Sequence, residues 1–167
     1  MRMEEHRRDQ EAEAVVALMV TSDTRTPETD ETGKMAIQLL EGVGHKVAGY
    51  VIVENDADRI MDAFQGFLDE EEIDVIITSG GTGIGSKDMT VDAVSDSFDK
   101  TVVGFGELFR RLSYDEIGEA STFSRATAGV ARGKLIFCLP GSKGAVRTAL
   151  SKIIIPALGH MLWEVKR

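Results

Sequence analysis

Short runs of apolar residues alternate along this chain with longer polar or mixed segments. The runs cover residues 15–20, 47–53, 75–77, 128–130 and 135–139. A short continuous apolar run is typical of a strand that is buried on both faces, as in a parallel sheet. The pattern therefore predicts strands at these places.

Between the runs, apolar residues recur at helical spacing. The stripes are formed by Ala36, Leu39, Leu40 and Val43, by Ile60, Phe64, Phe67 and Leu68, by Phe105, Leu108, Phe109 and Leu112, and by residues 146–161. The i, i+3, i+4, i+7 spacing of the first stripe indicates an amphipathic helix, which Gly42 and Gly44 are expected to end. Pro156 is expected to kink or split the last helix.

Alternation of strands and helices predicts crossover units and a parallel sheet that is covered on both faces. Residues 14–167 are expected to form a single domain, and residues 1–13, a charged mixture, a disordered arm. In such sheets, ligands bind beyond the carboxyl ends of the strands. The loops that follow Val20, Val53, Ile77 and Leu139 are therefore the candidate sites.

Composition and charge exclude several classes of function. The chain has 167 residues, 28 acidic against 19 basic, and a formal charge of −9. This balance argues against a nucleic-acid partner, because phosphate neutralisation needs a clustered basic face, although one small anion is still allowed. One cysteine, Cys138, excludes an internal disulfide, and three scattered histidines show no structural zinc spacing. No apolar run reaches the roughly 18 residues of a membrane helix, and we expect a cytoplasmic protein.

A glycine-rich segment, residues 79–88, follows the third predicted strand directly. Four glycines in six residues let the backbone adopt positive φ and expose successive amides to an anion, although an ordinary glycine-rich turn would have the same composition. Neither familiar phosphate motif fits. Ser86 precedes Lys87, which breaks the P-loop order, and Ser86 also stands where the dinucleotide fingerprint has its third glycine.

Asp88 closes this segment. A carboxylate beside a phosphate cradle would repel a bare phosphate, but it fits a divalent cation such as Mg²⁺ that bridges carboxylate and phosphate. The alternative is a surface aspartate near the start of the helix expected at Thr90, where the helix dipole favours it.

Five motifs occur in order along the chain. They are Thr78-Ser79-Gly80-Gly81-Thr82-Gly83, Lys87-Asp88-Met89-Thr90, Gly104-Phe105-Gly106-Glu107-Leu108-Phe109-Arg110, Ser124-Arg125 with Ala128-Gly129, and Leu139-Pro140-Gly141-Ser142. Together they resemble the MoaB/MogA family of molybdenum cofactor biosynthesis proteins. The resemblance runs from about Val15 to Trp163. The stretch from Leu112 to Gly118 is more similar to the MoaB branch than to the MogA branch.

This resemblance implies an α/β fold of three layers, α/β/α, around a mostly parallel central sheet. It also implies a homo-oligomer, a trimer or a dimer of trimers, whose contact would explain Gly104 and Gly106 in the apolar stripe. The implied activity is molybdopterin adenylyltransferase, with Mg²⁺ as cofactor, ATP and molybdopterin as substrates, and a contact with the metal-insertion protein of the pathway.

The resemblance also assigns residues. Ser79, Gly80, Gly81, Thr82 and Gly83 correspond to the phosphate loop, Ser124 and Arg125 to the pterin site and its anion, Pro140, Gly141 and Ser142 to the closing loop, and Thr21, Ser22 and Asp23 to the first loop. For Arg125 a surface ion pair is the alternative role. For Ser142 the alternative, which is compatible with the first role, is a helix N-cap.

One position departs from the family pattern. The family has a second active-site carboxylate after its second strand, and Asn55 stands there in this chain. We therefore predict Asp88 and Asp56 as metal ligands and catalytic residues together with Asn55, with Glu54 as a substitute for Asp56. The alternatives are a non-catalytic molybdopterin-binding oligomer of the same fold, and a generic nucleotide-binding sensor.

Overall fold

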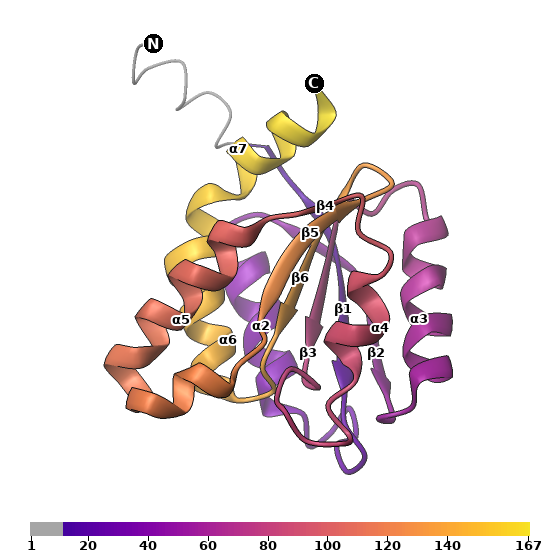
Figure 1. The fold of residues 1–167 in the computed structure, drawn as a ribbon. Helices are drawn as coiled ribbons and strands as arrows, with labels where there is room; N and C mark the ends of the chain where they lie inside the picture. Colours follow the sequence, from indigo (N-terminus) through magenta and orange to yellow (C-terminus); the bar gives the residue numbers. More distant parts are fainter. Residues whose placement is uncertain (1–11) are drawn as a thin grey trace.

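The computed structural model describes residues 12–167, so most of the expected N-terminal arm lies outside the described residues. One six-stranded sheet runs through the molecule in the order β2-β1-β3-β6-β5-β4 (Figure 1). Its strands are β1 (Val15–Thr21), β2 (Lys46–Val53), β3 (Val75–Ser79), β4 (Lys100–Thr101), β5 (Thr127–Ala131) and β6 (Lys134–Leu139). All five strands predicted from the apolar runs are present, and β4 was missed because it is only two residues long.

The sheet is mostly parallel, as the family resemblance implied, but not wholly parallel. β2, β1, β3 and β6 are parallel, whereas β5 and β4 form an antiparallel edge. The cause is the connection from β5 to β6. It consists of Arg132 and Gly133 alone, both with positive φ (52° and 75°), which is the conformation of a two-residue hairpin. A crossover to a parallel strand would need a dozen residues or more.

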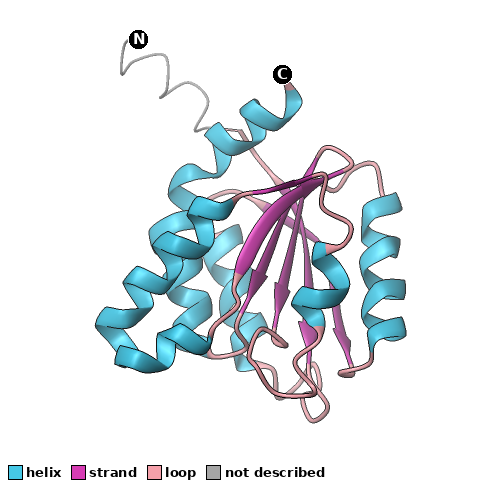
Figure 2. Cartoon of the chain, in the orientation of Figure 1, coloured by secondary structure: helices cyan, strands magenta, loops and turns pink. Residues whose placement is uncertain are grey.

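Helices cover both faces of the sheet, which gives the three expected layers (Figures 1 and 2). The helices are α2 (Glu31–Glu41), α3 (Ala57–Asp69), α4 (Thr90–Ser95), α5 (Val103–Ile117), α6 (Lys143–Ala149) and α7 (Ile155–Lys166), with a 3₁₀ segment at Gly118–Phe123. The alternation of β1 side chains shows the layering, because Leu18 packs in the core with α2, α5, α6 and α7, and Met19 packs with α3 and α4.

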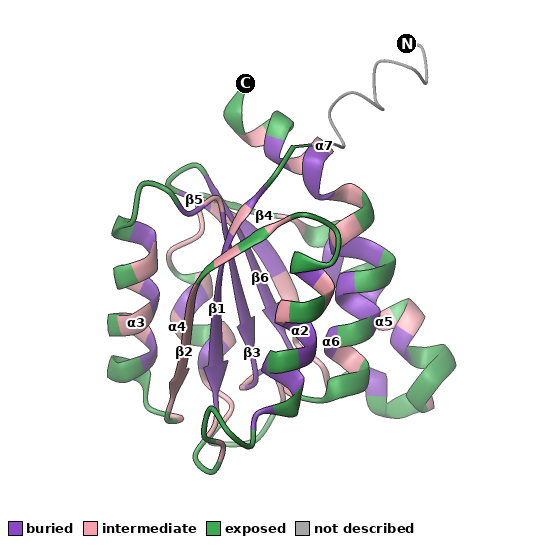
Figure 3. Ribbon diagram, turned by 180° about the vertical axis from the view of Figure 1, so that it is seen from behind, coloured by how far each residue is buried: buried purple, intermediate pink, exposed green. Residues whose placement is uncertain are grey.

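Burial follows the position of each strand in the sheet. β3 and β6 are buried throughout, and β1 nearly so, whereas β2 at the edge is only half-buried (Figure 3). The final helix is split as predicted. A five-residue π segment, Leu150–Ile154, precedes Pro156, which lies in the first turn of α7. Because proline has no amide hydrogen and crowds the preceding turn, a local change of helical pitch is expected there.

The carboxyl ends of the parallel strands meet at one edge of the sheet. Val20 of β1 is in register with Ser79 of β3, and Ser79 with Leu139 of β6. The loops that follow these three strands therefore start side by side. No helix within residues 12–167 is long and apolar enough to span a bilayer.

Candidate functional site

The glycine-rich loop after β3 is held against its neighbours by close backbone approach. Gly80 and Gly81 have φ of 107° and 70°. A Cβ at Gly80 would collide with the carbonyl oxygen of Thr21, and a Cβ at Gly81 with the hydroxyl of Thr90. Only glycine satisfies both the backbone conformation and the space at these positions.

This conformation leaves a row of amides open. Among the described residues, none accepts a hydrogen bond from the amides of Gly81, Thr82 or Gly83. The carbonyls of the loop, in contrast, are satisfied, because Thr90 N donates to Gly81 O (3.2 Å) and Arg125 N donates to Thr82 O (2.8 Å). Open amides on a fixed loop are the arrangement that binds an anion.

Asp88 is folded back over the loop. Its Oδ2 accepts a hydrogen bond from Gly85 N at 2.9 Å. A Cβ at Gly83 would come within 2.7 Å of this oxygen, and one at Gly85 within 3.0 Å. Within residues 12–167, no donor is bonded to Oδ1, which leaves that oxygen open to a ligand.

The guanidinium of Arg125 is hydrogen-bonded to the glycine-rich loop and to α4. Its Nε donates to Gly83 O at 2.8 Å and its Nη2 to Asp88 O at 2.8 Å. Both terminal nitrogens also bond the carboxylate of Asp92 on α4, at 2.7 and 3.0 Å. Binding of the pterin phosphate by Arg125 therefore stays a prediction, and the structure shows the side chain bonded within the chain. The guanidinium fixes the glycine-rich loop, and its pairing with Asp92 is the alternative that the sequence left open.

Ser79 and Gly80 join the glycine-rich loop to the end of β6 and the loop after it, and Ser142 joins that loop to α6. Ser79 is buried, and its Oγ donates to Pro140 O at 3.3 Å. Gly80 N donates to Leu139 O at 2.9 Å, which joins the same two loops. Ser142 is the N-cap of α6, with Oγ accepting from Ala145 N at 3.3 Å, as one of its two compatible roles predicted.

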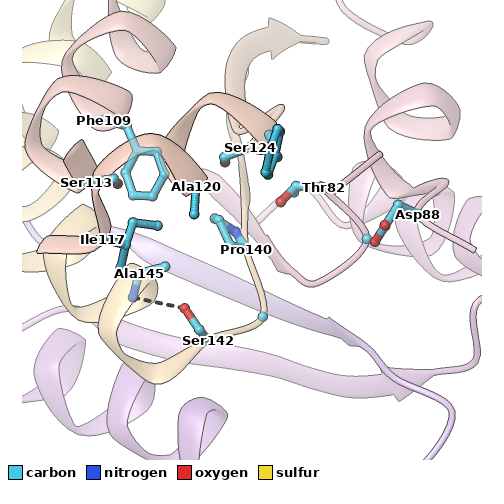
Figure 4. A pocket seen from close by; sticks show the side chains of 14 residues that line it. Thr82, Asp88, Phe109, Ser113, Ile117, Ala120, Ser124, Pro140, Ser142 and Ala145 are labelled. Carbon is cyan, nitrogen blue, oxygen red and sulfur yellow. Dashed lines mark hydrogen bonds between the residues drawn. The ribbon is translucent and has the colours of Figure 1, made fainter. Parts of the chain in front are cut away.

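An apolar hollow of about 280 Å³ opens beside the glycine-rich loop (Figure 4). The predicted site residues that line it are Gly81, Thr82, Gly83, Asp88, Ser124, Pro140, Gly141 and Ser142. The opposite wall comes from α5, the 3₁₀ segment and α6, and consists of Phe109, Ser113, Ile117, Ala120, Phe123 and Ala145. Sequence reasoning missed this wall as part of the site. Its only signal was the apolar character of residues that remain exposed, such as Ile117 and Phe123.

A second, polar hollow of about 370 Å³ adjoins the first. Its lining residues are Thr21, Ser22, Asp23, Thr24, Arg25, Asn55, Gly81, Lys87, Asp88 and Gly141. Gly81, Asp88 and Gly141 belong to both hollows. The predicted first loop therefore faces the glycine-rich loop, and Asp88 stands where the two hollows meet.

The second carboxylate of the polar hollow is Asp23, not Asp56. Asp56 is the exposed N-cap of α3, where its Oδ1 accepts from Arg59 N at 3.0 Å, and it lines neither hollow. Asp23 Oδ1 accepts from Asn55 N at 2.8 Å, and Lys87 Nζ lies 3.3 Å from Oδ2. The Asn55 amide first, and Lys87 after it, hold the pKa of Asp23 below its usual range. A role of Asp56 as metal ligand stays a prediction, and Asp23 is the carboxylate that lines the polar hollow with Asp88.

The polar hollow offers the ligands that Mg²⁺ prefers. Asp88 and Asp23 supply carboxylate oxygens and Asn55 an amide oxygen. Within the part of the chain that the structure describes, no group of three or more acidic, histidine or cysteine side chains is gathered to hold a metal by itself. This donor set fits a magnesium ion that is shared with substrate phosphates rather than one enclosed by protein.

Comparison with known proteins agrees with this architecture. Residues 17–160 match the family described as "Probable molybdopterin binding domain". The chain is 45% identical over 168 residues to molybdenum cofactor biosynthesis protein B of Bacillus cereus, with 100% of this chain and 99% of the relative covered. Its identity to the Bacillus subtilis protein of the same name is 44% over 170 residues, with the same coverage.

Solved structures give the same result. The crystal structure of a molybdenum cofactor biosynthesis protein B is similar at a TM-score of 0.90 and 46% identity, covering 93% of this chain and 98% of that one. The tungsten cofactor synthesizing protein MoaB of Pyrococcus furiosus has a TM-score of 0.83 and 34% identity, with the same coverage. The fold and the paired hollows thus define a MoaB/MogA-type protein. The chain belongs to the molybdopterin-binding domain family, in the MoaB branch of molybdenum cofactor biosynthesis proteins.

Proposed function

We propose that this protein transfers AMP from ATP to the terminal phosphate of molybdopterin and releases pyrophosphate. One observation carries the proposal: the apolar and polar hollows adjoin at Gly81, Asp88 and Gly141. A reaction between two phosphate-bearing molecules needs two adjoining sites whose phosphates meet at one point. The open amides of Gly81, Thr82 and Gly83 lie at that point.

The walls of the two hollows suggest which reactant each one takes. Phe109, Phe123 and Pro140 provide apolar surface for a flat heterocycle, and Thr82 and Ser124 provide polar groups near it (Figure 4). The polar hollow has Arg25 and Lys87 for a triphosphate. We therefore place the pterin in the apolar hollow and the ATP phosphates in the polar hollow.

The chemistry is a displacement at phosphorus. An oxygen of the molybdopterin phosphate forms a bond to the α-phosphorus of ATP, and the bond from that phosphorus to the bridging oxygen of the β-phosphate breaks. The electron pair leaves with pyrophosphate. The open amides, Lys87 and Arg25 offset the negative charge that builds up, and the fixed loop orients the attacking phosphate. Bound Mg²⁺, held by Asp88 and Asp23, supplies further charge neutralisation of the phosphates.

The direct test is turnover. Purified protein is mixed with ATP, Mg²⁺ and molybdopterin, and both pyrophosphate and adenylylated molybdopterin are measured. We expect the two products in equal amounts, dependent on Mg²⁺ and on Asp88, with Arg132→Ala at the far end of β6 as a matched control. Molybdopterin binding without product would instead support the non-catalytic alternative. ATP binding that needs no pterin would support the nucleotide sensor.

We further propose that the protein is a homo-oligomer, a trimer or a dimer of trimers. Val103, Leu108 and Tyr114 on α5 are 61%, 42% and 61% exposed, although they are large and apolar or aromatic. Gly106 does not need a subunit contact, because a Cβ there would meet Arg110 and the carbonyl oxygen of Ala126 within its own chain. Light scattering is expected to give a multiple of the 18.2 kDa chain mass, and a mass of 18.2 kDa at micromolar concentration would refute this. The metal-insertion partner and the cytoplasmic location remain predictions.

A further inference from the structure

We propose that Arg25 binds a diphosphate group in the polar hollow, on the side of the hollow that faces β2: the β,γ-phosphates of ATP before transfer and pyrophosphate after it. The inference rests on the proposed function for its choice of ligand. Neither the glycine-rich loop nor the motifs of the sequence point to Arg25. Its position in the fold carries the argument.

Arg25 is anchored on the side that faces the protein. Its Nη2 donates to Gly141 O at 3.0 Å, and its Nη1 lies 3.8 Å from Oδ1 of Asp30. The backbone amide of Arg25 donates to Ser22 Oγ at 3.0 Å, which fixes the loop that carries it. The guanidinium is therefore held between the loop after β1 and the loop after β6.

Asp30 explains why this anchor is rigid. Its carboxylate is fully buried, caps α2 by accepting from Gly33 N at 2.9 Å, and accepts from the Tyr50 hydroxyl at 2.5 Å. Burial, together with the Asp30 carboxylate, raises the pKa of Tyr50, so this phenol stays protonated as a donor. The Asp30 carboxylate accepts hydrogen bonds at both oxygens and orients the nearby guanidinium without forming a tight bidentate pair with it.

The remaining donors of Arg25 are available to a ligand. A guanidinium has five N–H donors, and one hydrogen bond, to Gly141 O, is formed within the described residues. The side chain of Arg25 is 32% exposed. It lines the polar hollow and also a neighbouring hollow of about 470 Å³ that reaches Tyr50 and the end of β2. Arg25 thus lies between the polar hollow and the hollow beside β2. A triphosphate whose α-phosphate lies near Asp88 and Gly81 would extend toward it.

The other cation of the polar hollow is Lys87. Its side chain is 79% exposed and lies 3.3 Å from Asp23, so water screens its charge and its position is less fixed than that of Arg25. Arg25 is the better-fixed cation, and its planar fork matches two phosphate oxygens. Arg25 also lines the hollow beside β2, which no residue of the glycine-rich loop lines. The residue should therefore discriminate between ligands with and without the terminal diphosphate.

The experiment is calorimetric titration of inorganic pyrophosphate, ATP and AMP, each with Mg²⁺, into four proteins: wild type, Arg25→Ala, Arg25→Lys and Arg132→Ala. Arg132 loses the same charge in a surface pair with Asp69, at the opposite end of the sheet. We expect Arg25→Ala to weaken pyrophosphate and ATP at least about tenfold and AMP less than about twofold, since one charge-assisted interaction is lost. Arg25→Lys should be intermediate, and Arg132→Ala should match wild type.

The outcomes distinguish ATP from pyrophosphate as the source of the diphosphate. They also distinguish failure of the Arg25 inference from failure of the proposed adenylyl transfer. A loss confined to ATP assigns the group to the substrate, and a loss confined to pyrophosphate assigns it to the product. Unchanged affinity for both, an equal loss for AMP, or a wild type that binds neither would overturn the inference. Selective loss in a protein that never turns over would leave the inference standing and refute only the adenylyl transfer. If a melting curve shows that Arg25→Ala does not fold, Arg25→Gln replaces it. Glutamine lacks the charge but can still donate to Gly141 O, and the same affinity changes are expected.

Discussion

The loops that follow β3 and β2 both leave the carboxyl edge of the sheet, and both carry an aspartate that the sequence offered as a metal ligand. In the loop after β3, Asp88 bonds one amide of its own loop with one oxygen and presents the other toward two adjoining hollows. In the loop after β2, Asp56 caps α3 and lines neither hollow. Asp23, from the loop after β1, lies in the polar hollow instead. The difference shows that a carboxylate is available to a ligand only where the hydrogen bonds it makes to nearby backbone amides leave one oxygen facing a hollow.

The largest effect should come from Gly80→Ala. The residue has a φ of 107°, and a Cβ would collide with the Thr21 carbonyl, which is backbone and cannot turn away. We expect a loss of at least about 2 kcal/mol in the free energy of unfolding, and loss of adenylyl transfer, because the loop must move. Denaturant unfolding and the turnover assay measure the two effects. Gly44→Ala, which has positive φ and open space, is the control for strain without collision.

Asp88→Asn should separate chemistry from structure. Asparagine can still accept from Gly85 N, so the melting temperature should change by no more than about 2 °C. The rate of adenylyl transfer should fall at least about hundredfold, because the fixed charge at the meeting point of the hollows is lost. Normal turnover of this variant in Mg²⁺ would show that no metal bridges through Asp88.

Arg125→Ala should loosen the glycine-rich loop. The guanidinium joins two loop carbonyls to Asp92, and we expect a loss of about 2 kcal/mol in stability, with lowered kcat. Arg125→Lys keeps the charge but cannot span the three partners, so it should restore only part of the loss. Arg125 holds the pKa of Asp92 below its usual value of 3.8. The part of the stabilisation that comes from the pair with Asp92 is therefore present at neutral pH and is lost as the pH falls below about 3.8, where the difference between the melting curves of wild type and variant should narrow.

Asp56 variants should show a capping effect alone. Asp56→Ala removes the side chain that accepts from Arg59 N and should cost about 1 kcal/mol, whereas Asp56→Asn caps nearly as well. Neither change should alter the turnover rate by more than about twofold at a temperature where both variants are folded. A hundredfold fall in rate for Asp56→Asn with unchanged melting would return Asp56 to the active site.

Asn55→Asp should have the smallest effect. The backbone amide of Asn55 donates to Asp23 at 2.8 Å, and that bond survives the substitution. A third carboxylate in the polar hollow should leave the rate unchanged or raise it, and should tighten the Mg²⁺ dependence measured by titrating the metal. A wild type without turnover alongside an active Asn55→Asp would identify the protein as a non-catalytic member of its family.

Local sequence patterns determined much of this fold. The apolar runs located the buried strands, because a strand covered on both faces has no polar side to reveal. The helical stripes located α2, α3 and α5, and Gly42 was correctly expected to end α2. The ordered motifs also indicated the family and the loops of the site, and the close contacts of Gly80 and Gly81 explain why this loop needs glycine at both positions.

Tertiary structure alone decided which side chains share a hollow. Arg25 and Asp23 come together with Asp88, more than 60 residues away in the chain, because parallel strands bring their carboxyl ends to one edge. The partners of Arg125 and Asp56 could not be predicted either. A charged side chain satisfies the nearest unpaired backbone group or opposite charge, and the spacing of residues along the chain does not record which groups folding leaves within reach.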